Sequence, residues 1–177
     1  MTITEEIKQL KKEKKCSDPA HYYVTPESTG YCRLYRRFFD LSKIAVGLEE
    51  QDDRILRRVI YGRERKVLNP EKTVLMPDAE ADCPMAHMAD RETIERMRGT
   101  YEDLAVVCYI NSTAELKQYS DVCVTSANAV QIVKALPNKN IFFIPDRNLA
   151  HFVAEQVPEK HFVYNEGFCP IHEEMQL

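Results

Sequence analysis

The stretch Leu104-Ala-Val-Val-Cys-Tyr-Ile110 decides the fold class, because an unbroken apolar run of this length predicts a buried strand. Shorter apolar or β-branched runs that also predict strands lie at residues 73–76, 122–125, 140–144 and 161–164. Helical patterns lie among them, at residues 90–97, 114–118, 127–136 and 149–156. Strands that alternate with helices predict an α/β fold with a parallel sheet.

The composition of the 177-residue chain is typical of a globular protein with one large or two small domains. Hydrophobic residues make up 44% and charged residues 29%, which excludes a disordered chain. The net charge of −4 gives no electrostatic basis for a nucleic-acid partner, and the arginine-rich residues 52–65 predict a solvated basic helix. The five scattered glycines exclude a Walker or Rossmann phosphate loop.

The N-terminal segment and the cysteines bear on the cellular compartment. No apolar run approaches the ~18 residues of a membrane span, so we expect no membrane partner. Residues 1–15 are charged throughout, unlike a secretory signal, and residues 3–15 predict an amphipathic helix. We therefore expect a cytoplasmic protein. The six cysteines, at positions 16, 32, 83, 108, 123 and 169, are then expected to be thiols or metal ligands and not disulfides.

Polar residues follow each strand predicted at the centre of the sheet. Residues 111–113 read Asn-Ser-Thr, residues 125–128 read Thr-Ser-Ala-Asn, and residues 145–148 read Pro-Asp-Arg-Asn. Such residues favour helix N-caps. Ligands of α/β sheets bind at the carboxyl ends of the strands, so the same residues could instead hold an anion. The sequence leaves both interpretations open.

A Cys-Pro motif occurs twice. The strand at residues 73–76 leads to Cys83-Pro-Met85, and the strand at residues 161–164 leads to Cys169-Pro-Ile171. The two cysteines are 86 positions apart. This repeated motif predicts two similar α/β units, each of which presents one cysteine from the loop after a strand.

These motifs, in this order, resemble the quinolinate synthase family. The matching stretches are Val67-Leu-Asn-Pro-Glu-Lys-Thr-Val-Leu-Met-Pro-Asp78, Asp82-Cys-Pro-Met-Ala-His-Met88, Tyr109-Ile-Asn-Ser-Thr-Ala-Glu115, Thr125-Ser-Ala-Asn-Ala-Val130, Pro145-Asp-Arg-Asn-Leu149 and Gly167-Phe-Cys-Pro-Ile-His172. Two shorter stretches near the start also match, Ala20-His-Tyr-Tyr-Val-Thr-Pro-Glu27 and Phe39-Asp-Leu-Ser-Lys-Ile-Ala45.

The resemblance implies three αβα layers around a pseudo-threefold axis, each of which gives one cysteine to a [4Fe–4S] cluster. We expect two of these layers here, at residues 1–84 and 85–177, with the third layer absent. Cys83 and Cys169 match the first and second cluster ligands, and the third ligand is expected to be missing. A cluster normally takes four cysteines, so three would leave one iron open as a Lewis acid. Cys108 and Cys123 match no ligand position and are predicted to be small core residues.

The resemblance also implies a reaction. The family condenses iminoaspartate with dihydroxyacetone phosphate to quinolinate, with loss of phosphate and water, in NAD biosynthesis. This implies a functional link to L-aspartate oxidase or aspartate dehydrogenase. His21 and Tyr23 match catalytic positions, where the tyrosine serves as acid and base. Five residues match substrate-binding positions: Tyr109, Asn111, Thr125, Ser126 and Asn128.

Three stretches depart from the family pattern, at residues 16–19, 28–38 and 52–65. The family reads Ala-Val-Ile-Leu where this chain reads Cys16-Ser-Asp-Pro19, and a one-base shift of suitable codons converts one into the other. All three stretches can be converted by a shift in the same direction. We hypothesise that they are translated out of frame and predict that the first layer is destabilised by buried polar groups. Resequencing the coding DNA tests this, because codons that do not give family residues when shifted would exclude it.

Two alternatives to an active enzyme stay open. One is an inactive remnant or fragment that retains one intact α/β layer. The other is a small anion-binding α/β module, which would explain the polar strand ends but not the repeated Cys-Pro motif.

Overall fold

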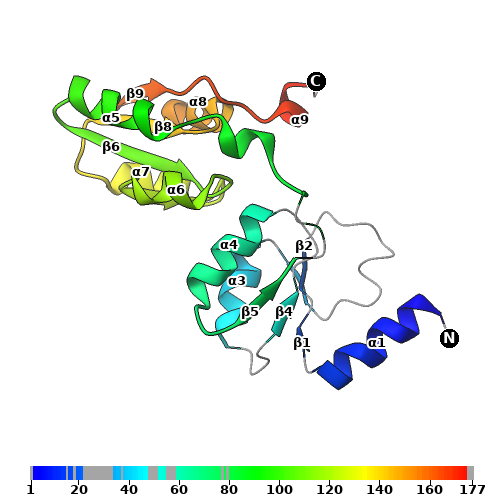
Figure 1. The fold of residues 1–177 in the computed structure, drawn as a ribbon. Helices are drawn as coiled ribbons and strands as arrows, with labels where there is room; N and C mark the ends of the chain where they lie inside the picture. Colours follow the sequence, from blue (N-terminus) through cyan, green and yellow to red (C-terminus); the bar gives the residue numbers. More distant parts are fainter. Residues whose placement is uncertain are drawn as a thin grey trace. The chain divides into compact units, whose positions relative to one another are not determined.

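A computed structural model of the chain describes residues 2–14, 16–17, 19–21, 34–36, 38–47, 52–54, 59–76, 78 and 80–174. The chain divides into two compact units, Met1–Asp82 and Cys83–Leu177 (Figure 1). Both cysteines of the repeated Cys-Pro motif belong to the second unit. No helix in the described part of the chain has the length and apolar character needed to cross a membrane.

The first unit contains short parallel strands and three described helices. Its elements are α1 (Ile3–Lys14), β1 (Cys16–Ser17), β2 (Pro19–His21), β3 (Leu34–Arg36), α3 (Phe38–Val46), β4 (Asp52–Arg54), α4 (Val59–Leu68) and β5 (Thr73–Leu75). The strands form two parallel sheets, of order β1-β4-β5 and β2-β3. Helix α1 confirms the amphipathic helix predicted at residues 3–15. It begins with a reciprocal capping box, in which Glu5 N donates to Thr2 Oγ1 and Thr2 N donates to Glu5 Oε2.

Where the structure describes them, the stretches that depart from the family pattern contribute residues to the strands β1, β2, β3 and β4, and their remaining described residues belong to the helices α3 and α4. Strand β4 pairs along its full length with β5, although its sequence is Asp-Asp-Arg. Pro19 is the first residue of β2, a position where the missing backbone N–H is tolerated. Within residues 28–38, Leu34–Arg36 form β3 and Phe38 begins α3, and the other residues of that stretch lie outside the described residues. Ladder hydrogen bonds between neighbouring backbones therefore form here without the side-chain pattern that would predict them.

The prediction of a solvated basic helix at residues 52–65 is wrong at two points: residues 52–54 form strand β4, and one arginine of α4 is buried. Arg63 is exposed, as a solvated basic helix requires, but Arg65 is only 1% exposed. The backbone carbonyl of Arg65 accepts a hydrogen bond from the buried Asn69 side chain at 3.1 Å. At the same end, Lys66 Nζ donates to the carbonyls of Pro70 and Lys72, which satisfies carbonyl groups beyond the helix.

The second unit contains the sheet that the sequence predicted most clearly. Its strands are β6 (Leu104–Tyr109), β7 (Val122–Val124), β8 (Asn140–Ile144) and β9 (His161–Tyr164). They are all parallel, in the order β7-β6-β8-β9. The helices are η1 (Pro84–His87), α5 (Arg91–Thr100), α6 (Ala114–Gln118), α7 (Ala129–Ala135), α8 (Arg147–Gln156) and α9 (Pro170–Glu173). The predicted α/β class with a parallel sheet is confirmed.

Helices cover both faces of this sheet, so β6 is buried along most of its length. Ala105 and Val107 pack with the buried residues of α7 and α8. Leu104, Val106 and Cys108 point to the other face and pack with Ile94 of α5 and Leu116 of α6. The sheet is thus the middle layer of an αβα sandwich.

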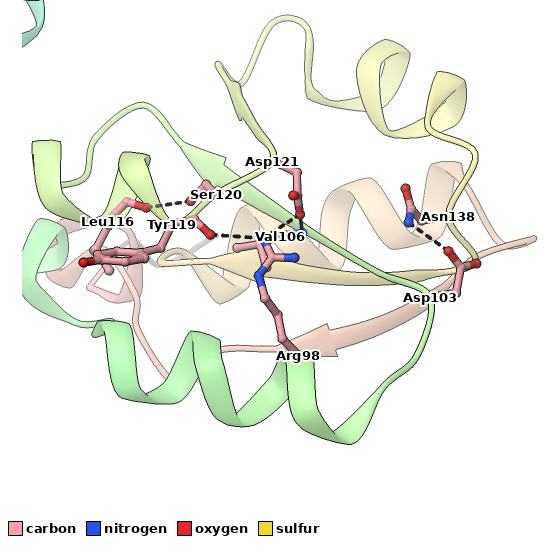
Figure 2. A network of polar contacts seen from close by, with 8 residues as sticks. All are labelled: Arg98, Asp103, Val106, Leu116, Tyr119, Ser120, Asp121 and Asn138. Atoms are coloured by element: carbon pink, nitrogen blue, oxygen red, sulfur yellow. Dashed lines mark hydrogen bonds and ion pairs between the residues drawn. The ribbon is translucent and has the colours of Figure 1, made fainter.

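A polar network fixes the loop that leads into β7 (Figure 2). Asp121 N donates to the carbonyl of Val106 at 2.9 Å, and the Asp121 carboxylate accepts from Val106 N at 2.7 Å. Arg98 of α5 donates to the same carboxylate at 2.9 Å and to the carbonyl of Tyr119 at 3.1 Å. These bonds set the register of the edge strand β7 against β6.

Candidate functional site

The five predicted substrate-binding residues lie at or just after the carboxyl ends of β6 and β7. Tyr109 ends β6 and Asn111 follows it, and the other three, Thr125, Ser126 and Asn128, lie in the turn between β7 and α7. Tyr109 is the last residue of β6 and pairs in register with Val124 of β7. Ile110 N extends the ladder by donating to Val124 O at 2.8 Å. Asn111 is half-buried, and its side-chain amide donates to the Tyr109 hydroxyl at 3.4 Å. The phenol and the amide therefore lie together at the end of β6.

The turn after β7 is held by its own side chains. Asn128 Oδ1 accepts from Thr125 N at 2.6 Å and from Thr125 Oγ1 at 2.9 Å. Ala129 N also donates to the carbonyl of Thr125, which closes the first turn of α7. Ser126, between these two residues, is exposed, and no hydrogen bond to another described residue fixes its hydroxyl. In this structure Thr125 and Asn128 shape the turn that presents Ser126.

The capping interpretation of the strand-end residues is correct at two positions. Thr113 caps α6 by accepting from Leu116 N at 3.2 Å, and Asp146 caps α8 by accepting from Asn148 N at 3.0 Å. Asn128 occupies the N-cap position of α7 but makes no side-chain cap bond. Its oxygen is turned back to Thr125, so capping does not explain this residue.

The two Cys-Pro motifs have the same local structure. Cys83 and Cys169 are the N-cap residues of η1 and α9, both have extended backbone angles, and a proline follows each at the start of its helix. Neither side chain makes a cap hydrogen bond. Cys83 is buried and Cys169 is half-buried. The repeated Cys-Pro motif therefore corresponds to a structural repeat of the turn that carries the cysteine.

A compact cluster, which we call the Asn165 node, joins the segments that carry these two cysteines. It consists of Met88, Pro145, Asn165, Gly167 and Phe168. The buried Asn165 side-chain amide donates to Met88 O at 2.8 Å and to Pro145 O at 2.9 Å. Phe168 N donates weakly to Met88 Sδ at 3.4 Å. The segment after η1 and the segment before α9 are thus tied to the end of β8.

Gly167 allows this close approach, because any side chain there would collide with the node. A Cβ on Gly167 would lie 2.5 Å from Pro145 O, 2.7 Å from Asn165 Nδ2 and 2.8 Å from Met88 Cβ. Sequence reasoning placed Gly167 in a family motif but missed its packing role, and it missed Asn165 altogether. A glycine two residues before a Cys-Pro motif in a glycine-poor chain was the available signal.

A second contact anchors the Cys169 segment to α8. The Glu173 carboxylate accepts from Asn148 at 2.9 Å and pairs with Arg147 at 3.1 Å. The hydrogen bond from Asn148, together with the one from Arg147, lowers the pKa of Glu173. Arg147 also stacks over the Phe168 ring at 4.7 Å. Cys169 therefore lies in the chain between Phe168 and Glu173, both of which contact Arg147 of α8.

The described residues do not by themselves fit an iron–sulfur cluster. Such a cluster normally takes four cysteines, and three is the number that the resemblance implies. Among the residues that the structure describes, no group of three or more His, Cys, Asp or Glu side chains could hold a metal ion. Cys83 and Cys169 are two candidate thiol ligands, and the described residues do not complete the donor set.

The remaining predicted residues are placed as follows. His21 is the last residue of β2, opposite Arg36 of β3. Tyr23 lies outside the described residues. Cys108 is fully buried in the core, as predicted, but Cys123 is exposed, so that prediction is wrong for Cys123. The reason is that β7 is the edge strand.

Comparison with known proteins agrees with the resemblance. The family model described as quinolinate synthetase A protein matches residues 5–177. A quinolinate synthase of Fusobacterium nucleatum is 47% identical over 175 residues, which is 99% of this chain and 59% of that protein. Quinolinate synthases of Clostridioides difficile and Clostridium perfringens are 42% and 43% identical, over 96% and 99% of this chain and 56% and 58% of those proteins.

The chain therefore spans little more than half the length of these relatives. The match nevertheless extends through both units of the chain. On this basis the chain belongs to the quinolinate synthetase A family.

Proposed function

We propose that this chain carries part of a quinolinate synthase site, and that the edge at the ends of β6 and β7 binds the anionic groups of the substrates. The substrates of this reaction are iminoaspartate and dihydroxyacetone phosphate. The observation that supports this proposal most directly is the position of these residues at the ends of two neighbouring parallel strands. Tyr109 ends β6 beside Asn111, and the turn that contains Ser126 follows β7. Hydroxyl and amide donors at such an edge suit carboxylate and phosphate oxygens.

The roles within this edge differ. The Asn111 amide and the Tyr109 hydroxyl are already bonded to each other, so they would present one joint donor surface to a substrate oxygen. Thr125 and Asn128 hold the turn in shape. The exposed Ser126 hydroxyl is the donor available at the tip of that turn.

His21 and Tyr23 are proposed as the acid–base residues, with the Tyr23 phenol moving protons during isomerisation and dehydration. Cys83 and Cys169 are proposed as the thiols that this chain would offer to a [4Fe–4S] cluster, which needs a further ligand. The proposed reaction also implies a cytoplasmic location, with L-aspartate oxidase or aspartate dehydrogenase as the source of iminoaspartate.

Calorimetry with dihydroxyacetone phosphate tests the substrate edge in the full chain. A hydrogen bond to a charged oxygen contributes about 1.5–3 kcal/mol, so Ser126→Ala should weaken binding by about tenfold to a hundredfold. The matched control is Thr100→Ala, which removes an exposed hydroxyl at the end of α5. Equal affinity of Ser126→Ala and the unaltered chain would contradict the assignment of Ser126.

Turnover distinguishes the proposal from its alternative. Quinolinate formation by the anaerobically reconstituted chain, and its loss in Tyr23→Phe, would show that the missing cluster ligand is supplied from outside the described residues and that the chain is active. Binding of dihydroxyacetone phosphate without any turnover would instead support an inactive chain with one intact layer.

A further inference from the structure

Two cysteines that the proposed function does not use face each other across neighbouring strands. Cys108 of β6 and Cys123 of β7 are direct partners in the parallel ladder, and both are reduced. Neighbouring strands lie about 4.8 Å apart. Disulfides join residues whose Cα atoms are about 4.4–6.8 Å apart, so the backbone spacing permits a bond between these two residues.

The loop before β7 holds this pair in register. Asp121 is bonded to Val106 through both its backbone N–H and its carboxylate, and Arg98 of α5 fixes the carboxylate (Figure 2). Asp121 is two residues before Cys123, and Val106 is two residues before Cys108. A slip of β7 along β6 would break these bonds, so Cys123 stays opposite Cys108.

The surroundings of the two thiols differ in a way that suits a two-step reaction. Cys123 is exposed and can meet a dissolved reagent, whereas Cys108 is fully buried. Cys108 Sγ lies 2.8 Å from Ser112 Oγ. The hydrogen bond with the Cys123 thiol, helped by those with Ser112 and Ser120, outweighs burial and lowers the pKa of Cys108 to about 7.

We propose that Cys108 and Cys123 form a reversible dithiol–disulfide modification site whose oxidant is a small-molecule disulfide. Cys123 gives its thiol proton to the Cys108 thiolate and attacks the reagent disulfide; the S–S bond of the reagent breaks, and the reagent thiolate that is released takes the proton from Cys108 and leaves as a thiol. The Cys108 thiolate then attacks Cys123 Sγ and displaces the second reagent thiol. Two protein thiols are oxidised to one disulfide, and the reagent disulfide is reduced to two thiols.

Closing this bond would strain the pairing of β6 with β7. The Cβ atoms of a disulfide lie about 3.5–4.5 Å apart, which is less than the strand spacing, so β7 must move toward β6. A strained disulfide is more easily reduced, which makes the modification reversible. The register of β6 against β7 and the surroundings of the two thiols favour this reaction whether or not the chain has the proposed function.

Oxidised glutathione and trypsin test the proposal in the full chain. Lys117 separates the two cysteines, so trypsin places Cys108 in residues 99–117 and Cys123 in residues 118–134. After oxidation and alkylation of remaining thiols, mass spectrometry should find these two peptides joined. Dithiothreitol should separate them again.

Two variants serve as controls. Cys123→Ser should lose the joined peptide, and Cys169→Ser, which changes another partly accessible thiol, should retain it. Cys108→Ala should accumulate glutathione on Cys123, because the resolving thiol is gone. A stable glutathione adduct on Cys123 of the unaltered chain, with Cys108 still alkylated as a thiol, would overturn the proposal whether or not the variants fold.

Discussion

Replacement of Gly167 by alanine should destabilise the second unit by several kcal/mol. The added Cβ would lie within 3 Å of three atoms, two of which, Pro145 O and Met88 Cβ, are part of or next to the backbone and cannot move cheaply. Overpacking of this kind costs about 1–3 kcal/mol. Displacement of the Asn165 amide would also weaken its two hydrogen bonds, each worth about 1 kcal/mol. The expected total is about 2–5 kcal/mol, a large share of the 5–15 kcal/mol that holds a typical domain.

Hydrogen exchange of β6 measures this effect, because its buried amides exchange only when the second unit opens. The matched control is Gly99→Ala, where a Cβ would meet nothing within 4 Å. Gly99 lies inside α5, so alanine there should stabilise the unit by about 0.5–1 kcal/mol. Equal protection of β6 in Gly167→Ala and in the unaltered chain would refute the packing argument.

Three further predictions concern polar contacts of the second unit. Asp121→Ala removes the acceptor of the Val106 amide and the partner of Arg98, and should lower the urea midpoint by the equivalent of about 1–3 kcal/mol; an unchanged midpoint would contradict it. Asp90 caps α5, and its hydrogen bonds from the first turn lower its pKa. The contribution of the Asp90 cap to folding stability is therefore present above the ordinary carboxyl pKa and is lost as the pH falls through the lowered pKa. Asp90→Ala should cost about 1 kcal/mol of stability at pH 7 and progressively less in acid. Denaturation measured at a series of pH values checks this. Lys160→Met removes the ammonium group that donates to the carbonyls of Leu136 and Asn138 after α7, and should speed amide exchange in that loop without changing exchange in α5.

The local structure of the second unit could be read from the sequence because it depends on neighbouring residues. The helix predicted at residues 114–118 has those bounds in the structure, and the strand predicted at residues 104–110 is one residue longer than β6. Thr113 and Asp146 act as the caps that their residue types favour. Apolar periodicity and capping chemistry operate within one turn or one strand, so they are visible in a short window of sequence.

The short strands of the first unit could not be predicted in this way. β4 reads Asp-Asp-Arg, which has none of the residue types that favour strands, and it forms because β1 and β5 supply ladder partners on both sides.

The sequence by itself determined the α/β class, the family and the positions of the polar strand ends, because each is carried by contiguous motifs. The tertiary structure decided which of those motifs meet. It placed β7 at the sheet edge, which exposes Cys123 opposite the buried Cys108, and it joined the two cysteine-bearing turns through Asn165. Strand order and close backbone approach depend on packing between segments as far apart as Met88 and Asn165, and no local pattern of residues encodes that packing.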